Sequence, residues 1–580
     1  MAEVIKVYPG KDDLVRVVDI NFADGTNAKK PVTKLILLMK TKQEKSCIYR
    51  LEVKTILMTE TFQRRLLWEQ QKLSNEKGKQ MRWHPAIIRW CIALQNRSAS
   101  AYNLMRETGF LRLPHPRTLH PYSHFADTAS GFCPEMLQRI VSDIGLNKEN
   151  SELKKDVSLM FDEMKIKSGL GFSSRSGQIV GFTDVGTLGN EINTRRCKGE
   201  EEPPVATHVL VLMLRGIFCK LHAPVGYCPT KGASSDELFS CLWEAVEYVE
   251  TAGFRVRAFI SDGASPNRKF YRLHSTPGST SITYVTHNEI DPTRNIYFIC
   301  DVSHLMKTTR NNFENSNYHY KTRHLHYNKM DIKWTYLLEL YNWDTGLDRY
   351  SPGLRRLHKI SYEHLHLTPS LRMRVYMAVQ VLSSTVANAL ECHGQYYTAS
   401  TAKFIRMFDT FFDCLNVSRL HQDSHSLKPA LAPYRSSDDW RFKWLKEDFL
   451  GFLDEWETQV NNLDNVSKSE KQKMLLSRET QEGLRITVNS FVDLASELLS
   501  RPDVDFLLSE KFNQDPLEQY FSKQRGAGGT CDNPTVAQFG QNMQALYVAS
   551  SCAKASKRGN CRGPDERSCM LDDTPLPRRR

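Results

Sequence analysis

Residues 257–268, R-A-F-I-S-D-G-A-S-P-N-R, indicate how the middle of the chain folds. The apolar run at 256–261 is typical of a strand that is buried on both faces, and Asp262 follows it directly. Ser265 and Pro266 then form a typical helix start, because proline is tolerated in the first turn. A buried strand, a carboxylate at its end and a helix behind it predict an α/β region.

The same pattern extends from residue 155 to residue 310. The spacing predicts a strand at 157–166 that holds Asp162, strands at 177–185, 205–218, 256–261 and 295–300, and a helix at 235–251. Three antiparallel strands, a helix and then parallel strands are the order of an RNase H-like core. The predicted fold class is therefore α/β with such a core.

Three acidic residues occupy the chemically important places in that order. Asp162 lies near the middle of the first strand, and Asp262 ends a later strand. Glu518 lies in a predicted final helix, within N-Q-D-P-L-E-Q-Y-F at 513–521. Carboxylates that a fold gathers from distant segments are what two-metal phosphoryl transfer requires. We therefore predict that these three residues are catalytic and hold Mg²⁺ or Mn²⁺.

Each acid also has a plainer interpretation. Asp162 stands beside a second acid, which is compatible with a solvated strand edge, and Asp262 followed by glycine is a turn signal. The D-P-L-E sequence at 515–518 is a capping-box pattern with Asp515 as the N-cap. Both interpretations can hold at once, because Asp515 and Glu518 are three residues apart and share a helix face.

Residues 301–307, D-V-S-H-L-M-K, follow the last predicted strand. Asp301 ends that strand, and the residues behind it can open a helix. Lys307 then lies within two turns of the helix start, where its ammonium group can reach a phosphate. A solvated lysine is the alternative.

Composition limits the class of protein. The 580 residues suggest more than one domain, and the net charge of +12 fits a polyanion partner such as nucleic acid. The 14 cysteines show no C-x-x-C pair and no zinc-finger spacing, so we expect reduced thiols in an intracellular protein.

Residues 1–11 do not resemble a signal peptide, and the apolar run at 209–214 is too short to span a bilayer. No membrane partner is expected.

The flanking segments suggest further units. Residues 1–45 predict a small β unit, with strands at 14–20 and 32–38 and a turn at 24–25. The segment at 60–79 is charged and helical in pattern.

Residues 83–125 predict a compact helical module. We expect one helix from Pro85, a second that Ser98 or Ser100 caps and Gly109 ends, and a third capped by Thr118. A helix-turn-helix is the functional interpretation, and a plain helical hairpin is the alternative.

Helical periodicity dominates after the α/β region, for example at 373–390 and 402–415. The expected organisation is a β unit (1–45), a helical region with the helix-turn-helix (60–150), the first part of the RNase H-like core (151–325), a large all-helical insertion (326–510), the final core helix (511–545) and a basic, mobile tail (546–580).

Taken together, the peptides resemble a known family. Four peptides occur in the order seen in P-element transposases: F-D-E-M-K, I-S-D-G-A-S-P-N-R-K-F, D-V-S-H-L-M-K-T-T-R-N and Q-D-P-L-E-Q-Y-F-S-K-Q-R-G-A-G-G-T. Within that family, the chain is most similar to the THAP-associated transposases of animals. The likeness extends to M-R-W-H-P-A-I-I-R-W-C and S-A-S-A-Y-N-L-M-R-E-T-G, and covers roughly residues 60–563.

The resemblance implies a cut-and-paste DNA transposase whose catalytic carboxylates are Asp162, Asp262 and Glu518. It also implies that the helical insertion binds GTP as an assembly cofactor. Asp301 and Lys307 match that nucleotide motif, and Asp515 matches an acid that approaches the nucleotide and its Mg²⁺. The resemblance further implies that the partner is double-stranded DNA, both transposon ends and target. It also implies a homo-oligomer and a nuclear location.

Three departures from the family pattern matter. No Cys/His set for the usual THAP finger occurs, and residues 4–40 resemble instead the C-terminal tail of BEL/Pao retroelement polyproteins. Val302 and Ser303 replace the usual Pro-Pro, and Pro121 falls in the third helix of the 83–125 module, where it should shorten that helix.

Two kinds of function follow. The first is a metal-dependent transposase that cleaves DNA and transfers strands, with GTP as an assembly cofactor. The second is a catalytically silent, transposase-derived protein that binds DNA and GTP, or a chimeric transposon relic. The complete set of acids favours the first, and the missing finger favours the second.

Overall fold

The protein is described from a computed structural model. It describes residues 2–9, 15–22, 27–31, 62–77, 81–123, 130–147, 152–173, 177–186, 189–191, 203–276, 278, 281–317, 322–346, 355–420, 428–527 and 533–549. These residues fall into two compact units, one formed by those of 1–88 and 103–114, and the other by those of 89–102 and 115–549.

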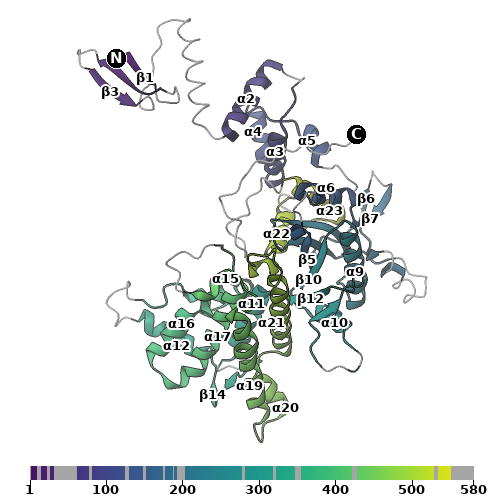
Figure 1. The fold of residues 1–580 in the computed structure, drawn as a ribbon, viewed down its shortest axis with the longest axis vertical. Helices are drawn as coiled ribbons and strands as arrows, with labels where there is room; N and C mark the ends of the chain where they lie inside the picture. The colour runs from purple at the N-terminus through teal and green to yellow at the C-terminus, as the bar shows by residue number, and fades with distance from the viewer. Residues whose placement is uncertain are drawn as a thin grey trace. The chain divides into compact units, whose positions relative to one another are not determined.

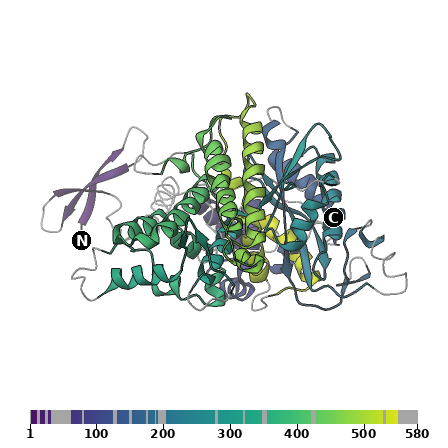
Figure 2. The ribbon, with the colours of Figure 1, turned by 90° about the horizontal axis from the view of Figure 1, so that it is seen from below.

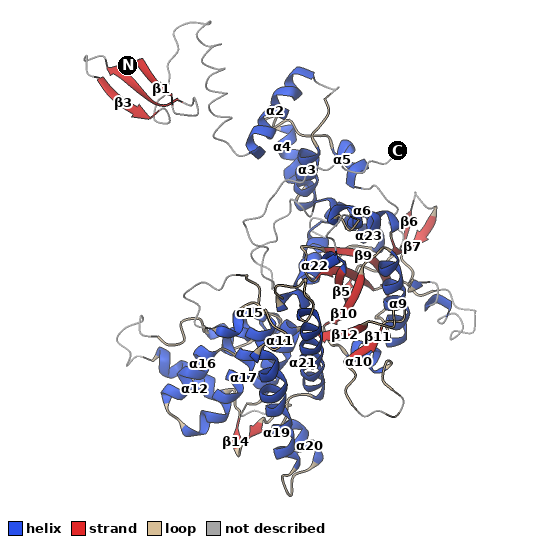
Figure 3. Cartoon of the chain, viewed as in Figure 1, coloured by secondary structure: helices blue, strands red, loops and turns tan. Residues whose placement is uncertain are grey.

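The larger unit contains a seven-stranded sheet in the order β11-β12-β10-β5-β8-β9-β4, with the helices between residues 302 and 512 to one side of it (Figures 1 and 3). Its strands are β4 (Gly131–Phe132), β5 (Asp156–Lys165), β8 (His208–Gly216), β9 (His222–Thr230), β10 (Arg255–Ser261), β11 (Val285–His287) and β12 (Asn295–Cys300). β5, β8 and β9 are antiparallel, whereas β5, β10 and β12 run parallel. This antiparallel-then-parallel order confirms the predicted RNase H-like core.

The predicted helix at 235–251 is α9 (Ser235–Thr251). Ser234 caps it, because the Ser234 hydroxyl accepts from the Glu237 N–H while the Glu237 carboxylate accepts from the Ser234 N–H. α9 is followed by β10, and α10 (Ser265–Arg272) comes after β10 with proline in its first turn, as the sequence predicts.

The predicted strand at 177–185 does not belong to this sheet. β7 (Gln178–Val180) covers part of it and pairs with β6 (Gly171–Ser173) in a separate two-stranded sheet. β9 takes the place instead, and the sequence did not predict it. Its Pro224, Gly226 and Pro229 disfavour strands, and Pro224 is accommodated beside a register shift between β8 and β9.

Helices dominate from residue 302 to residue 512. They are α11 (Val302–Asn315), α12 (Thr335–Thr345), α13 (Tyr362–Leu365), α14 (Pro369–Arg372), α15 (Val375–Val381), α16 (Ser384–His393), α17 (Ala399–Leu415), α18 (Trp440–Lys443), α19 (Leu450–Asn461), α20 (Lys468–Lys473) and α21 (Arg478–Leu499). The predicted all-helical insertion also holds a short hairpin, β13 (His326–Tyr327) and β14 (Met330–Asp331). The periodic stretch at 373–390 is divided between α15 and α16.

α21 joins the helical insertion to the sheet (Figure 2). The Thr487 hydroxyl bonds both the N–H and the carbonyl of Cys300 at 3.0 Å, and the Ser490 hydroxyl donates to the Phe298 carbonyl. Gly483 lets α21 approach α11 closely, because a Cβ there would lie 2.8 Å from the Leu305 Cδ2 atom. The insertion is therefore fixed against β12 along the length of α21.

The N-terminal segment forms a three-stranded antiparallel sheet of β1 (Ala2–Pro9), β2 (Val15–Phe22) and β3 (Asn27–Pro31). β2 corresponds to the strand predicted at 14–20. The strand predicted at 32–38 and the turn at 24–25 lie outside the described residues. α2 (Phe62–Lys77) is the helix predicted at 60–79.

Three helices occupy the 83–125 module: α3 (Pro85–Arg97), α4 (Ala99–Glu107) and α5 (Pro116–Ser123). The Ser98 hydroxyl accepts from the Ala101 N–H, so Ser98 caps α4 as predicted. α5 begins two residues before Thr118, which therefore is not its cap, and Pro121 lies inside this short helix. Among the described helices, none is both long and apolar enough to cross a membrane.

Candidate active site

Strand register brings acids together at the carboxyl ends of three adjacent parallel strands, β5, β10 and β12. The last parallel pair between β10 and β5 joins Ile260 to Met160, so two residues further along each strand Asp262 comes level with Asp162. β12 pairs Cys300 with Ser261, which places Asp301 beside Asp262. β5 is buried through Phe161 and becomes partly exposed at Asp162. The carboxyl ends of parallel strands are where open α/β sheets place ligands.

The final helix, α22 (Asp515–Ala527), is fastened to the same edge by the residues before it. The Gln514 side-chain amide donates to the Phe161 carbonyl at 2.9 Å and the Ile260 carbonyl at 3.3 Å, and its backbone N–H donates to Asp301 at 3.0 Å. The Arg215 guanidinium of β8 donates to both oxygens of Asn513 at 2.7 Å. The start of α22 is thus tied to β5, β8, β10 and the end of β12.

Glu518 lies in the first turn of α22. Its carboxylate forms an ion pair with the Lys307 ammonium of α11, at 3.8 Å between Nζ and Oε1. The Lys307 side chain is 8% exposed and the Glu518 side chain 31%, so the lysine approaches from the interior and the carboxylate remains accessible. We refer to Asp162, Asp262, Asp301, Asp515 and Glu518 as the acid cluster.

The negative charge of the acid cluster is only partly compensated, by Lys307 beside Glu518 and by Arg215 near Asp515. Burial, and then the Asp262 and Glu518 carboxylates, raise the pKa of Asp162 well above its ordinary value. Burial and the Asp301 carboxylate likewise raise the pKa of Asp515 to about 7, against the opposing effect of Arg215. Acids whose charges repel one another in this way are stabilised by a bound cation.

The side chains as they stand are each held by a different donor. Asp162 accepts from the Glu163 N–H at 2.7 Å, and Asp262 accepts from the Ala264 N–H and the Asn267 amide at 2.8 and 2.7 Å. Within the described part of the chain, no three Asp, Glu, His or Cys side chains are so placed that they could hold a metal ion. The fold therefore gathers the acids, but their present rotamers do not form a ready-made coordination shell.

Of the three residues predicted to bind the nucleotide, Asp301 and Asp515 belong to the acid cluster and Lys307 contacts it. Asp301 is buried and caps α11, with one oxygen accepting from the His304 N–H and the other from the Gln514 N–H. Lys307 contacts Glu518. Asp515 is the first residue of α22, because the Gln514 carbonyl accepts the first helical bonds, so the capping box predicted with Asp515 as N-cap is not formed.

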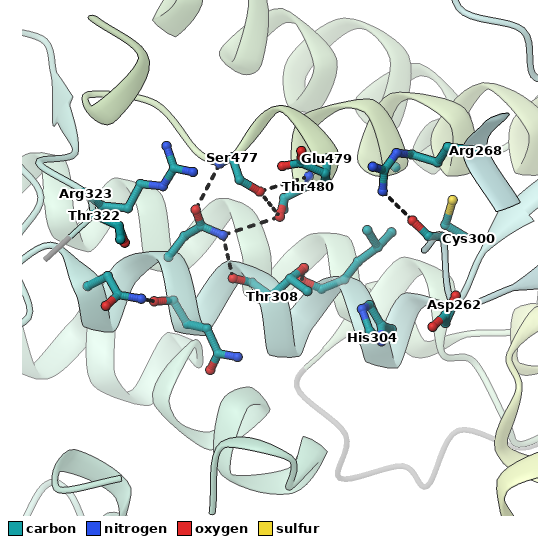
Figure 4. A pocket seen from close by; sticks show the side chains of 16 residues that line it. Asp262, Arg268, Cys300, His304, Thr308, Thr322, Arg323, Ser477, Glu479 and Thr480 are labelled. Atoms are coloured by element: carbon teal, nitrogen blue, oxygen red, sulfur yellow. Dashed lines mark hydrogen bonds between the residues drawn. The ribbon is translucent and has the colours of Figure 1, made fainter. Parts of the chain in front are cut away.

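A polar groove of about 280 Å³ begins at Asp262 and runs between α11 and the start of α21 (Figure 4). One wall is the polar face of α11, and the other contains the Ser477 cap of α21. Arg323 lies at the end away from Asp262, where its guanidinium donates to the Gln472 carbonyl. The polar side chains along the groove are Arg268, His304, Thr308, Asn311, Asn312, Asn315, Thr322, Glu479 and Thr480. We call it the α11–α21 groove.

Two partly buried lysines lie at α22: Lys511 just before it and Lys523 within it. Burial and the nearby Arg215 guanidinium lower the pKa of Lys511, and burial and Arg97 lower that of Lys523. Lysines in such surroundings lose their proton more readily than solvated lysines do.

Sequence reasoning missed the residues that align the cluster. Gln514 and Arg215 carry no motif of their own: a glutamine before a helix and an arginine near a strand end are common. Only their contacts across about 300 residues of sequence show their role. A signal was available for Gln514, since it directly precedes the acidic start of α22.

Family comparisons agree with this geometry. Residues 128–275 match the model for the TNP-like RNase H N-terminal domain, residues 303–428 the TNP-like GTP-binding insertion domain, and residues 510–543 the TNP-like RNase H C-terminal domain. Together they cover more than half of the chain, in the order expected of an RNase H-like core split by an insertion.

Two curated relatives match across most of the chain. The Drosophila melanogaster protein "Transposable element P transposase" is 23% identical over 82% of this chain and 55% of its own length. The Homo sapiens protein "DNA transposase THAP9" is 24% identical over 78% of this chain and 47% of its own length. The chain belongs to the P element transposase family. It spans about half the length of the curated relatives that it matches.

The family fold is also seen in a solved structure, the Drosophila P element transposase strand transfer complex. It superposes with a TM-score of 0.63 over 87% of this chain and 98% of that chain, at 21% identity. The likeness supports the fold, and the roles of individual residues depend on the geometry of the site itself.

Proposed function

We propose that this P element family member is a metal-dependent DNA transposase in which Asp162, Asp262 and Glu518 are the catalytic carboxylates. The observation that carries the proposal is the strand register that sets Asp162 level with Asp262, with α22 fastened across the same strand ends. The mutual repulsion that raises the pKa of Asp162 supports the same assignment.

The donor set suits a hard divalent cation. Carboxylate oxygens are the ligands that Mg²⁺ and Mn²⁺ prefer, and no thiol or imidazole is required. Asp162, Asp262 and Glu518 would hold the ions after their carboxylates leave the backbone, amide and lysine donors that now bind them. Cations bound there supply Lewis-acid activation of a water or DNA 3′-OH and stabilise the leaving oxygen.

The remaining groups of the site position these acids. Gln514 holds the ends of β5 and β10 together under α22, and Arg215 fixes the backbone one residue earlier. Lys307 holds Glu518 and, once that carboxylate turns away, can place its ammonium against a phosphate oxygen. Lys511, just before α22, and Lys523, within it, are the lysines that we assign to the DNA backbone.

The insertion would bind GTP in the α11–α21 groove. Most of the groove's polar side chains come from residues that match the GTP-binding insertion domain, and amides, hydroxyls and two arginines suit the base and phosphates of a nucleotide. The groove ends at Asp262, so a bound nucleotide would lie next to the acid cluster, near Lys307 and Asp515. Asp301 would act indirectly there, because both of its oxygens already hold backbone.

Nuclease and nucleotide assays test the two parts separately. Wild-type chain should nick supercoiled plasmid in Mn²⁺, and Asp162→Ala should not, whereas the exposed control Glu363→Gln should behave as wild type.

A fluorescent GTP analogue should bind at least tenfold more weakly to Arg323→Ala than to wild type or to the exposed insertion control Arg355→Ala. Equal nicking by wild type and Asp162→Ala would contradict the catalytic assignment.

A DNA- and GTP-binding protein without catalysis is the second candidate. The absence of an ion-ready group of side chains in the described residues favours it. Nucleotide binding and DNA binding without any Mn²⁺-dependent nicking would select it. We propose, in addition, double-stranded DNA as the partner, a homo-oligomeric assembly and a nuclear location.

A further inference from the structure

A second concavity lies between α6 (Pro134–Ile144) and α9, away from the residues that we assign to catalysis. Its volume is about 890 Å³. We call it the α6–α9 groove. Phe132, Leu137 and Val141 give it an apolar floor, and the Phe132 ring lies 4.8 Å from that of Tyr248 between centroids.

The wall formed by α9 is acidic. Glu244 and Glu247 both line the α6–α9 groove, and within the described residues neither forms an ion pair. Burial, with Asp184 and Glu247 nearby, raises the pKa of Glu244, so its charge lacks a compensating cation. The Tyr248 hydroxyl is buried without a hydrogen-bond partner among the described residues. An apolar floor, two unpaired carboxylates and an unmatched hydroxyl are complementary to a short peptide that carries both cations and carbonyls.

The chain supplies such a peptide at the place where it is needed. α23 (Val536–Ala549) is the last described helix, and the Tyr547 hydroxyl near its end donates to Asp143 of α6 at 2.8 Å. Asp143 directly follows Ser142, which lines the groove. The next residues, 550–563, read S-S-C-A-K-A-S-K-R-G-N-C-R-G, with four cations and no acid.

Length presents no obstacle. Fourteen residues span at most about 50 Å when extended, whereas α6, with 11 residues, is about 16 Å long. A segment that leaves α23 beside Asp143 can therefore run the whole length of the groove.

We propose that residues 550–563 dock in the α6–α9 groove, with their cations paired to Glu244 and Glu247. Docked, the segment covers the Phe132–Tyr248 face and satisfies the Tyr248 hydroxyl. It also holds four positive charges that would otherwise be free to contact DNA. The proposal is independent of the assignment of the acid cluster.

Hydrogen exchange on the full-length chain tests it. Reversing the cations, with Lys554→Glu, Lys557→Glu, Arg558→Glu and Arg562→Glu together, should speed amide exchange in α6 and the second half of α9 several-fold. Glu244→Lys with Glu247→Lys should do the same, and the two sets combined should restore slow exchange, because the charges again complement each other. Glu363→Lys with Asp464→Lys, at exposed acids elsewhere, is the matched control.

Two results would overturn the proposal. One is unchanged exchange in α6 and α9 when the four cations are reversed, which would leave the groove empty or filled by something else. The other is protection that grows with protein concentration, which would assign the occupant to a second copy of the chain.

Discussion

The two ends of β5 place aspartates in opposite electrostatic surroundings. Asp156, at the first residue, is fully buried and contacts three guanidinium groups, at 3.4 Å from Arg255, 3.3 Å from Arg257 and 2.7 Å from Arg501. Asp162, six residues later, lies near the Asp262 and Glu518 carboxylates, and among the described residues no arginine forms an ion pair with it. At the first end, arginines compensate the carboxylate, and one of them, Arg257, also pairs with Glu497 of α21. The second leaves its charge unbalanced, which is costly unless a ligand compensates it.

The comparison predicts its largest effect at the second end. Asp162→Asn should reduce Mn²⁺-dependent DNA nicking by about a thousandfold, the scale on which losing several kcal/mol of charge stabilisation acts. The same change should leave the metal-free chain at least as stable as wild type, because it removes a repelled charge. Nicking rates and thermal unfolding in EDTA measure the two quantities. A destabilised Asp162→Asn chain would mean that this acid is structural.

At the first end of β5, replacing Asp156 should lower stability and leave nicking unchanged. Asp156→Asn should lower the free energy of unfolding by about 3–5 kcal/mol, because three arginines then lose their buried carboxylate. Nicking per folded molecule should stay close to wild type. Denaturant unfolding followed by circular dichroism measures the loss, and a change below 1 kcal/mol would remove the contrast between the two ends.

Acidity in the cluster gives a pH-dependent prediction. Because the folded-state pKa of Asp515 is raised to about 7, the folded chain binds more protons than the unfolded chain between about pH 4 and pH 7. Its contribution to stability is present below pH 4 and is lost as the pH rises through 7. In EDTA, Asp515→Asn should therefore stabilise the chain at pH 8, by at most about 4 kcal/mol. A variant less stable than wild type at pH 8 would contradict the assigned repulsion.

The smallest effect is expected at Gln514, an uncharged residue that aligns the acid cluster. Gln514→Met removes the two side-chain bonds to β5 and β10, which should cost about 1–3 kcal/mol of stability. Nicking should fall by more than that loss explains, through kcat and not KM, because α22 is no longer fixed over the strand ends. Gln481→Met is the control, since that side chain also donates to a backbone carbonyl but lies in α21. Equal effects of both variants on kcat would rule out a positioning role.

The sequence predicted most of the sheet because strands buried on both faces consist largely of apolar residues, which are visible in the sequence. The apolar runs behind β10 and β12 and the capped helix α9 were located from residue type alone. β9 was missed because Pro224, Gly226 and Pro229 disfavour strands, yet pairing with β8 overrides that preference.

Local sequence patterns pointed to the acids of the candidate site but not to the residues that align them. Asp162, Asp262 and Glu518 each follow a recognisable local signal. Gln514 acts through contacts to distant strands, and its one local signal, the position directly before the acidic start of α22, does not indicate those partners. Lys307 was expected to meet a phosphate, and in the structure it meets Glu518, a partner that the linear sequence does not indicate.

Counting bound Mn²⁺ on the full-length chain by electron paramagnetic resonance tests the central claim most directly. If the acid cluster is a cation site, wild type and the exposed-acid control Asp464→Asn should bind up to two ions with DNA present, and Asp162→Asn should lose them. Equal Mn²⁺ binding by wild type and Asp162→Asn would contradict the account.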